Sequence, residues 1–374
     1  MATTRKALIV GGGIAGMSAA LELTRNGLSV DLIDNDPEWR VYGAGITITG
    51  PTLRAFHQLG ILEQVMAHAY TGHGIQICNV AGERVTVVPT PSSGEPSLPC
   101  SGGIMRPVLH QILSERVRAS STKVRLGLTV DSLHDTEHEV EAQFSDGTRG
   151  AYDLVIGADG IFSRVRSLIF PQAPKAEYTG QTCWRLVAPR PASIERRNFF
   201  LGGKVKVGLS PVSDAEMYMF LLETTPRHPH MDDNLLWGKL AQLLDGYGGV
   251  LQDIRNNLNG SSRIVMRPLE AFFLPAPWHK GRTLLIGDAA HPTTPQLASG
   301  AGMAVEDALV LGQEISKHQE IEALFQGFME RRYRRCRLVV ENSFEIGRRE
   351  QRGAPVEEQT RLVEESLAAL AQPI

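Results

Sequence analysis

Three glycines and one acid near the start of the chain have the spacing that binds a dinucleotide. Gly11, Gly13 and Gly16 form a GxGxxG pattern, and Asp34 follows 18 residues after the last of them. The first glycine allows a tight turn, the second lets backbone approach a pyrophosphate, and the third lets a helix pack on a strand. The acid accepts hydrogen bonds from a ribose diol and disfavours NADP, whose 2′-phosphate it would repel. These residues predict a site for FAD or NAD and leave that choice open.

The apolar pattern around these residues predicts the elements that hold them. Residues 7–10 form a short apolar run typical of a buried parallel strand, and residues 15–26 have the pattern of a helix that ends near Gly27. A second strand is expected over 29–33. Together these make a dinucleotide-binding βαβ unit. A basic start and an apolar middle also fit a secretory signal loosely, but three consecutive glycines are awkward for a signal helix.

A glycine and an acid recur far downstream. The apolar run 283–286 predicts a strand that ends at Gly287 and Asp288, and a helix is expected from residue 303 onward. A carboxylate at the end of a strand can accept a hydrogen bond from a sugar or ribityl hydroxyl. Glycines just before a helix, such as Gly300, offer backbone N–H groups and the positive end of the helix dipole to an anion. A reduced flavin is such an anion.

A third glycine-rich turn lies midway along the chain. Asp159 and Gly160 follow another apolar run, and Arg164 and Arg166 open the helix predicted after them. Arginines beside a glycine-rich turn favour contact with a pyrophosphate, because their planar guanidinium groups match phosphate oxygens.

The composition limits the other classes of function. The chain has 374 residues, 42% hydrophobic and 21% charged, with a formal net charge of -3, which argues against a dedicated nucleic-acid-binding protein. No uncharged apolar stretch reaches the roughly 20 residues that span a bilayer, so no membrane partner is expected. The four cysteines lie far apart without CxxC spacing, as suits a reducing, cytoplasmic location, and no metal site is expected.

Taken together, the three segments resemble the single-component (group A) FAD-dependent aromatic hydroxylases of the para-hydroxybenzoate and salicylate hydroxylase type. The segment YGAGI, from Tyr42 to Ile46, is similar to the part of that family beside the flavin ring. The chain departs from the family pattern at Asp34, where Glu is usual, and at Ala304, where many members have Asn. The resemblance implies FAD as cofactor, and carries the following residues over as its binding site: Gly11, Gly13, Ile14, Ala15, Gly16, Asp34, Asn35, Arg40, Ala44, Gly45, Arg106, Asp159, Gly160, Gly287, Asp288, Pro295, Gly300, Ala301, Gly302 and Met303.

The resemblance also implies the architecture. We expect an α/β fold, with a Rossmann-like FAD-binding domain of the glutathione-reductase type, an inserted, mostly antiparallel sheet that meets the substrate, and C-terminal helices. The expected boundaries are 1–72, 99–174 and 272–317 for the FAD-binding domain, 73–98 and 175–271 for the substrate domain, and 318–374 for the helical segment. The alternating apolar and polar residues of 74–91 and 179–265 are typical of such strands.

The activity that the resemblance implies is a monooxygenase reaction on a small aromatic or heteroaromatic ring. NADH or NADPH reduces the flavin, O2 adds to form a C4a-hydroperoxyflavin, and a hydroxyl group is transferred to the ring. A flavin-dependent reductase or oxidase of the same fold, or a flavin-binding protein without turnover, stays an alternative. The sequence leaves open NADH against NADPH, the identity of the substrate, and monomer against homodimer.

The catalytic candidates lie on strands expected to cover the flavin. Tyr218 could hydrogen-bond a phenolate, and Arg185 or Lys206 could hold a carboxylate or lower the pKa of a phenol, while the resemblance places Pro295 over the flavin ring. Trp184 could stack on a substrate, although a tryptophan on a strand is more often part of a core. Alternation alone does not show which face of the sheet meets the flavin.

Two charged segments are predicted to have no catalytic role. The run RRYRRCR over 331–337 is interpreted as a solvated helix face rather than a nucleic-acid-binding patch. The segment RHPHMDD over 227–233 is interpreted as a turn-rich surface loop rather than a metal site.

Overall fold

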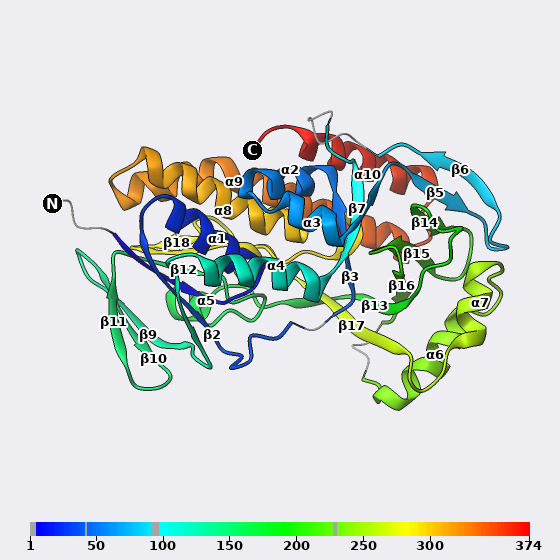
Figure 1. Cartoon of the computed structure of the whole chain (residues 1–374), viewed down its shortest axis with the longest axis horizontal. Coiled ribbons are helices and arrows are strands. Elements are labelled where there is room, and N and C mark those ends of the chain that lie inside the picture. Colours follow the sequence, from blue (N-terminus) through cyan, green and yellow to red (C-terminus); the bar gives the residue numbers. More distant parts are fainter. Residues whose placement is uncertain (1–4, 42, 91–96, 227–229) are drawn as a thin grey trace.

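The computed structural model describes residues 5–41, 43–90, 97–226 and 230–374. Two large sheets lie toward opposite ends of the long axis, and long helices of the C-terminal third run across both (Figure 1). This is the α/β fold with an inserted sheet that the sequence predicts. None of the helices in the described ranges combines the length and apolar character needed to cross a membrane.

The first sheet has six strands in the order β18-β19-β12-β1-β2-β8. Its strands run parallel except for the edge strand β18, which is antiparallel to β19. The strands are β18 (His279–Lys280), β19 (Thr283–Leu285), β12 (Leu154–Gly157), β1 (Lys6–Val10), β2 (Ser29–Asp34) and β8 (Lys123–Leu126). The central strands are apolar runs because both of their faces are covered.

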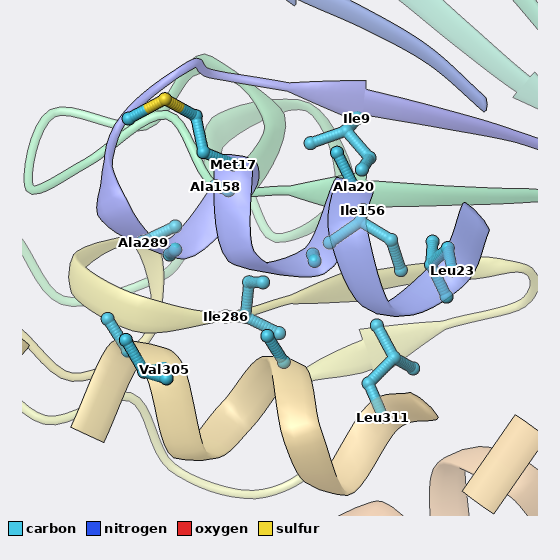
Figure 2. Packing of buried hydrophobic residues seen from close by; sticks show 14 of the residues in the cluster. Ile9, Met17, Ala20, Leu23, Ile156, Ala158, Ile286, Ala289, Val305 and Leu311 are labelled. Carbon is cyan, nitrogen blue, oxygen red and sulfur yellow. The ribbon is translucent and has the colours of Figure 1, made fainter. Parts of the chain in front are cut away.

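Helices α1 (Ile14–Arg25) and α8 (Gly300–Lys317) pack against these strands (Figure 2). One buried cluster joins β1, β12 and the residue after β19 to both helices. Its members include Ile9, Ile156, Ile286, Met17, Ala20, Leu23, Val305 and Leu311. α8 begins three residues before the predicted start at 303. Gly300 and Gly302 in its first turn have a low helix propensity, so the sequence pattern does not show where the helix begins. Glycine is required at 302 because a Cβ atom there would lie 2.3 Å from Thr52 Oγ1.

The second sheet, here called the roof sheet, has seven strands in the order β17-β13-β16-β15-β14-β5-β6. All neighbours are antiparallel except β14 and β5. The strands are β5 (Ile75–Cys78), β6 (Arg84–Val88), β13 (Glu177–Pro189), β14 (Arg197–Phe200), β15 (Lys206–Pro211), β16 (Glu216–Thr224) and β17 (Arg263–Ala271). All fall within 73–98 and 175–271, although the predicted domain boundaries themselves stay a prediction.

Two helices that the sequence reasoning missed cover one face of the roof sheet. α6 (Leu236–Leu243) and α7 (Val250–Asn257) interrupt the stretch 179–265, for which only strands were expected. Leu240 and Leu251 are buried with the apolar side chains of that face. The opposite face is therefore the one available to a ligand.

Smaller elements join the two large sheets. The three-stranded sheet β3-β7-β4 lies between them, and the meander β11-β10-β9 extends away from the first sheet (Figure 1). The remaining elements before the C-terminal helices are β3 (Gly45–Thr49), α2 (Gly50–Leu59), α3 (Leu62–His68), β4 (Tyr70–Gly72), β7 (Ser101–Met105), α4 (Arg106–Ala119), β9 (Val130–Asp135), β10 (Val140–Phe144), β11 (Arg149–Tyr152) and α5 (Arg164–Ile169).

The chain ends in two helices, α9 (Ile321–Gln351) and α10 (Val356–Ala371). The prediction of a solvated arginine face on the first of them is wrong in part. Arg332 is fully buried and Arg335 is largely buried, whereas Arg337 is exposed. The reason is that α8 presents carboxylates to this side of α9.

Candidate functional site

The glycine turns and acids of the sequence motifs meet at one edge of the six-stranded sheet. Val10 of β1 is in register with Ile33 of β2 and Gly157 of β12, and Gly157 is in register with Leu285 of β19. Because these strands are parallel, the residues that follow each of them lie side by side at the carboxyl edge. Open α/β sheets bind their ligands at this edge.

The first turn requires glycine at two positions for different reasons. Gly11 has φ +106°, and a Cβ atom there would lie 2.4 Å from the Ala158 carbonyl oxygen. A Cβ atom at Gly16 would lie 1.8 Å from the Gly11 carbonyl oxygen. At Gly13, by contrast, no atom lies within 4 Å of the Cβ position. The turn is thus closed on its protein side and open where a pyrophosphate would approach.

Asp34 is tied to this turn. Its Oδ2 accepts a hydrogen bond from the backbone N–H of Gly12 at 2.6 Å, and its Oδ1 accepts one from the N–H of Asp36 at 2.8 Å. The carboxylate is half-buried, which suits a group that turns its remaining lone pairs to a ribose. The adjacent Asn35 is exposed.

Trp39 is a part of this turn that the sequence reasoning missed. Its indole N–H donates to the Gly12 carbonyl oxygen at 2.9 Å, and its ring is buried with the edge of His110 against it. Trp39 has φ 51°, a left-handed backbone that lets the ring turn back over the glycines. Arg40, which follows, is about half exposed and forms ion pairs with Asp36 and Glu38.

Neither helix that points at this edge has a side-chain cap. The N-cap of α1 is Gly13, and no side chain accepts from its first turn, which includes Ile14 and Ala15. The N-cap of α8 is Ser299, whose hydroxyl donates to the Leu297 carbonyl oxygen instead of accepting from the helix. The free N–H groups and the positive dipole ends of two long helices are therefore available to an anionic ligand. Gly300, Ala301, Gly302 and Met303 form the first turn of α8.

Opposite charges surround the opening between these helices. The side chain of Asp288 is exposed to solvent, yet burial among protein atoms raises its pKa, while His291 and Arg106 oppose that rise. Arg106 is also exposed, yet burial lowers its pKa. Both observations fit side chains at the bottom of an opening in the protein. Arg185 of the roof sheet adds a second positive charge beside Arg106.

Hydrogen bonds within the protein hold the turn at Asp159 and Gly160. The Asp159 carboxylate accepts hydrogen bonds from the Ser163 hydroxyl and from backbone N–H groups at the start of α5, while burial raises its pKa. Arg166 is buried, and its guanidinium donates to the carbonyl oxygens of Ala289 and Ile161. Two of its donors therefore serve protein carbonyls, and its contact with a pyrophosphate stays a prediction.

Strand register identifies the face of the roof sheet that meets this edge. Arg185 lies directly opposite Phe220, and Lys206 lies directly opposite Leu222. Opposite residues share a face, as do residues two apart on one strand, so Tyr218, Arg185 and Lys206 lie on one face, here called the inner face. Trp184 lies on the other face, fully buried against the core beneath α6 and α7, so the core interpretation of Trp184 is correct.

The inner face rests directly on the first part of the chain. The Tyr218 hydroxyl and the Thr47 hydroxyl of β3 share a hydrogen bond, and the Tyr218 ring lies where a Cβ atom at Gly45 would be. Ala44 is buried beside Tyr218, and its carbonyl oxygen accepts from the Arg106 N–H at 3.1 Å. The segment from Ala44 to Gly45 therefore lies between the cofactor edge and the roof. Tyr42, which begins the YGAGI motif, lies outside the described residues.

Lys206 is not a free cation. Its Nζ donates to Glu350 Oε1 of α9 at 2.7 Å, and Glu350 Oε2 accepts from the side-chain amides of Gln181 and Gln296 at 3.2 Å each. Gln296 directly follows Pro295 in the loop before α8. Lys206 therefore lies in a polar cluster with Gln296, the neighbour of Pro295, and the charge of Lys206 is already paired.

Arg185 is a cation of the inner face whose charge is unpaired. Among the described residues its guanidinium has no hydrogen-bond or ion-pair partner, and the residue is only half-buried. Aromatic side chains extend the same face: Phe220 packs edge-on against Phe199 with ring centroids 5.8 Å apart, and tilted against Tyr218 at 6.2 Å. The inner face therefore combines an available positive charge with aromatic walls.

A buried ion cluster stands behind the turn that carries Asp288. Asp307 of α8 accepts from the Gly287 N–H at 2.8 Å and from His291 at 2.7 Å through one oxygen, and from Arg332 Nε at 2.8 Å through the other. Arg332 also donates to Glu306 at 2.8 Å. His291, Asp307 and Cys336 lie as close together as metal ligands would, but the Arg332 guanidinium supplies the positive charge at this place.

The cluster has a consequence for stability at alkaline pH. Burial alone would lower the pKa of His291, but neighbouring Cys336 and the Asp307 carboxylate outweigh burial and raise it well above its usual value. A raised pKa in the folded state gives stability that is complete below the unfolded-state pKa of about 6.5 and is lost as the pH rises through the folded-state value. We expect the free energy of unfolding of the wild type to fall from about pH 6.5 upward more steeply than that of His291→Gln. Urea unfolding of both proteins at several pH values measures this, and parallel curves would contradict it.

Comparison with known proteins agrees with this site. Residues 4–343 match a family model described as an FAD binding domain. The chain is 31% identical over 367 residues to YetM of Bacillus subtilis, whose name assigns it provisionally to the FAD-dependent monooxygenases, with 98% of both chains covered. It is 31% identical over 346 residues to 2-heptyl-3-hydroxy-4(1H)-quinolone synthase of Pseudomonas aeruginosa, covering 91% of this chain and 88% of that protein.

Solved structures show the same fold. HpxO of Klebsiella pneumoniae, complexed with FAD and uric acid, superimposes with a TM-score of 0.84 at 23% identity, over 99% of this chain and 93% of that chain. The open glycine turn, the two uncapped helix N-termini and the charged opening around Asp288 fit the pyrophosphate and the sugar hydroxyls of FAD. The chain belongs to the FAD-dependent monooxygenases of the aromatic hydroxylase type, and FAD is its cofactor.

Proposed function

We propose that the protein uses NADH or NADPH and O2 to hydroxylate a small aromatic or heteroaromatic ring that carries negative charge. The observation that carries this proposal is the inner face, where the unpaired Arg185 stands beside aromatic side chains and close to Arg106 of the cofactor edge. A positive charge without a protein partner favours an anionic ligand, and aromatic walls favour a flat one.

We propose the residues of the carboxyl edge as the FAD site. Gly11, Gly13 and Gly16 with the first turn of α1 would hold the pyrophosphate, and Asp34 the adenosine ribose. Asp288 and Arg106 would hold the ribityl chain, and the N-terminus of α8 would face the pyrimidine side of the flavin ring. The bound flavin supplies hydride acceptance and oxygen activation. The protein would bind and orient the substrate and exclude water.

The inner face would orient the substrate ring. Arg185 would hold a carboxylate or stabilise a phenolate through charge-assisted hydrogen bonds. The Tyr218 hydroxyl, already joined to Thr47, has a lone pair or a proton for a ring oxygen. The Lys206 ammonium is already paired with Glu350, so a positioning role suits it better than direct contact with the substrate.

The relatives support a heteroaromatic substrate. The Pseudomonas aeruginosa relative is named for a quinolone, and the Klebsiella pneumoniae structure contains uric acid. Both are nitrogen-containing ring systems. We also propose a cytoplasmic location, which the four free thiols support, and leave monomer and homodimer as the two assembly states to be distinguished by light scattering.

The purified protein tests the proposal directly. It should be yellow, and oxidation of NADH or NADPH should accelerate when a substrate is added from a panel of phenols, benzoates, quinolones, pyridines and purines. Oxygen uptake and a product heavier by one oxygen atom should accompany this acceleration. Bound flavin without substrate-stimulated oxygen uptake across the panel would refute the hydroxylase and favour a reductase or oxidase.

Replacement of Arg185 separates substrate binding from cofactor binding. We expect Arg185→Gln to lower kcat/KM for an anionic ring about tenfold to a hundredfold, since a charge-assisted hydrogen bond contributes about 1.5–3 kcal/mol. The FAD content should stay at the wild-type level. Arg84→Gln is the matched control, because Arg84 is an exposed arginine of β6 at the far edge of the same sheet, opposite Cys78 of the core beneath α6 and α7. Equal values of kcat/KM for the two variants would refute the role of Arg185.

A further inference from the structure

A cavity of about 570 Å³ opens at the end of the roof sheet, outside the residues discussed so far. Its walls come from β4 with His73 and from the segment 190–196, which joins β13 to β14. We call it the vestibule and define it by Tyr70, His73, Arg190 and Arg196. A narrow inner cavity shares Tyr70, His73 and Arg196 with it. The inner cavity is small, about 10 Å³, so it has room for a single oxygen atom or water molecule.

Arg190 is held in the wall of the vestibule by hydrogen bonds and by an aromatic ring. Arg190 donates through Nε to the Asp214 carbonyl oxygen and through Nη1 to the Ile194 carbonyl oxygen, at 3.0 Å each. Its guanidinium stacks on the ring of Tyr70, with the central carbon 4.8 Å from the ring centroid. The Tyr70 hydroxyl in turn donates to the Glu195 carbonyl oxygen at 2.9 Å. These contacts give the vestibule a fixed, flat wall.

A second arginine is available to a ligand. Within the described ranges, the guanidinium of Arg196 has neither a hydrogen-bond nor an ion-pair partner. Glu195 is the one carboxylate among the described lining residues of the vestibule, against the two arginines and His73. The vestibule is therefore suited to attract an anion.

The inner cavity contains two buried polar atoms without a partner. Ser101 is 4% exposed, and its hydroxyl has no hydrogen-bond partner in the described part of the chain. The same holds for Arg197 Nε, and burial lowers the pKa of that guanidinium. An unsatisfied buried donor destabilises the fold, and both residues line this cavity. One oxyanion would accept hydrogen bonds from both.

The inner cavity leads toward the proposed substrate site. Arg197 and Phe199 are two apart on β14, so they share the inner face, and Phe199 packs against Phe220. Tyr218 lies close enough to Arg197 to affect the pKa of its guanidinium. Pro211 lines the cavity on the strand next to β16.

We propose that the vestibule binds the oxyanion of a reactant, one oxygen of which enters the inner cavity, and that reactants approach the inner face from this side. The oxyanion is a carboxylate or phenolate of the aromatic substrate, or a phosphate of the nicotinamide dinucleotide, since both present the same acceptor oxygens to Arg196, Arg197 and Ser101. The inference rests on the proposed function for the reactants, but the binding chemistry is a property of the cavity alone.

Equilibrium binding to the FAD-loaded protein tests this inference without turnover. The probes are NADPH, NADH, benzoate and inorganic phosphate, measured by calorimetry at low salt with Arg196→Gln, Arg197→Lys and Ser101→Ala. We expect Arg196→Gln to raise the Kd of at least one probe about tenfold or more. Ser101→Ala should weaken the same probe without lowering Tm, because the lost hydroxyl has no protein partner. Arg84→Gln is the control, because Arg84 is an exposed arginine of β6 in the same sheet.

The pattern of losses identifies the ligand. Weaker binding of both NADPH and NADH assigns the site to the phosphates that the two nucleotides share. Weaker binding of NADPH alone assigns it to the 2′-phosphate. Weaker binding of benzoate assigns it to the substrate carboxylate. Weaker binding of inorganic phosphate alone assigns the site to an adventitious ion only and overturns the proposal that reactants bind here. Unchanged Kd values in all three variants also overturn it, while leaving substrate-stimulated oxygen uptake, and so the proposed function, intact.

Discussion

Arg332→Met is expected to lower the free energy of unfolding by about 3–5 kcal/mol, the usual cost of removing one partner from a buried ion pair. The side chain of Arg332 is 0% exposed, as is that of Asp307, and Glu306 is 3% exposed. Methionine fills much of the same volume, but it removes the buried guanidinium that Asp307 and Glu306 share. Among the described ion pairs, Asp307 then keeps only His291, and Glu306 only Arg335. Urea unfolding followed by circular dichroism measures the loss.

A matched control lies on the same helix. Arg337 pairs with Glu341 four residues later, with both side chains more than half exposed, so Arg337→Met should change the free energy of unfolding by about 0.5 kcal/mol or less. Similar losses in the two variants would show that helix α9, rather than the ion cluster, determines the effect.

The ion cluster also links α9 to the cofactor site. Asp307 holds the Gly287 N–H, and Asp288 is the next residue. We therefore expect Arg332→Met to weaken FAD binding as well as folding, because Asp307 loses the group that orients it. Burial alone would raise the pKa of Asp307, but His291 and Arg332 lower it to about 2, so the carboxylate is charged at neutral pH.

The turns proposed to hold the cofactor could be predicted from sequence because their signals are local. Gly11 is glycine because of its own φ angle and one nearby carbonyl group, and Asp34 follows from the end of a strand that its apolar neighbours mark. Because these requirements act between residues close in sequence, the glycines and the acid occur at a fixed spacing that can be recognised. The start of α8 was predicted three residues too late, because the glycines of its first turn have a low helix propensity.

Contacts between distant segments account for what the sequence did not predict. Arg332 is 25 residues from Asp307, and a run of arginines has the same composition whether the helix face is solvated or covers carboxylates. The inner face is a similar case. Alternation predicted strands with Tyr218, Arg185 and Lys206, but only the pairing register shows that the three share a face. The partner of Lys206 comes from a helix 144 residues away.

Two alanine substitutions in the first turn should separate folding from cofactor binding. Gly13→Ala is expected to leave the Tm of the FAD-free protein unchanged, because no atom lies within 4 Å of the new Cβ atom and the backbone φ of -78° suits any residue. Its affinity for FAD should fall at least about tenfold, or about 1.4 kcal/mol, because the methyl group occupies the space where the pyrophosphate approaches. Calorimetric titration with FAD and thermal unfolding of the FAD-free protein give the two values.

Gly16→Ala is the contrasting variant. Its Cβ atom would lie 1.8 Å from the Gly11 carbonyl oxygen, a backbone atom that cannot move without shifting β1 against α1. Both Tm and FAD affinity should therefore fall, since the helix can no longer pack on its strand. If Gly13→Ala kept wild-type affinity for FAD, the pyrophosphate would not lie over this turn. If instead Gly13→Ala lowered Tm as much as Gly16→Ala, the turn would be a purely structural feature, and the open side at Gly13 would have no part in holding the cofactor.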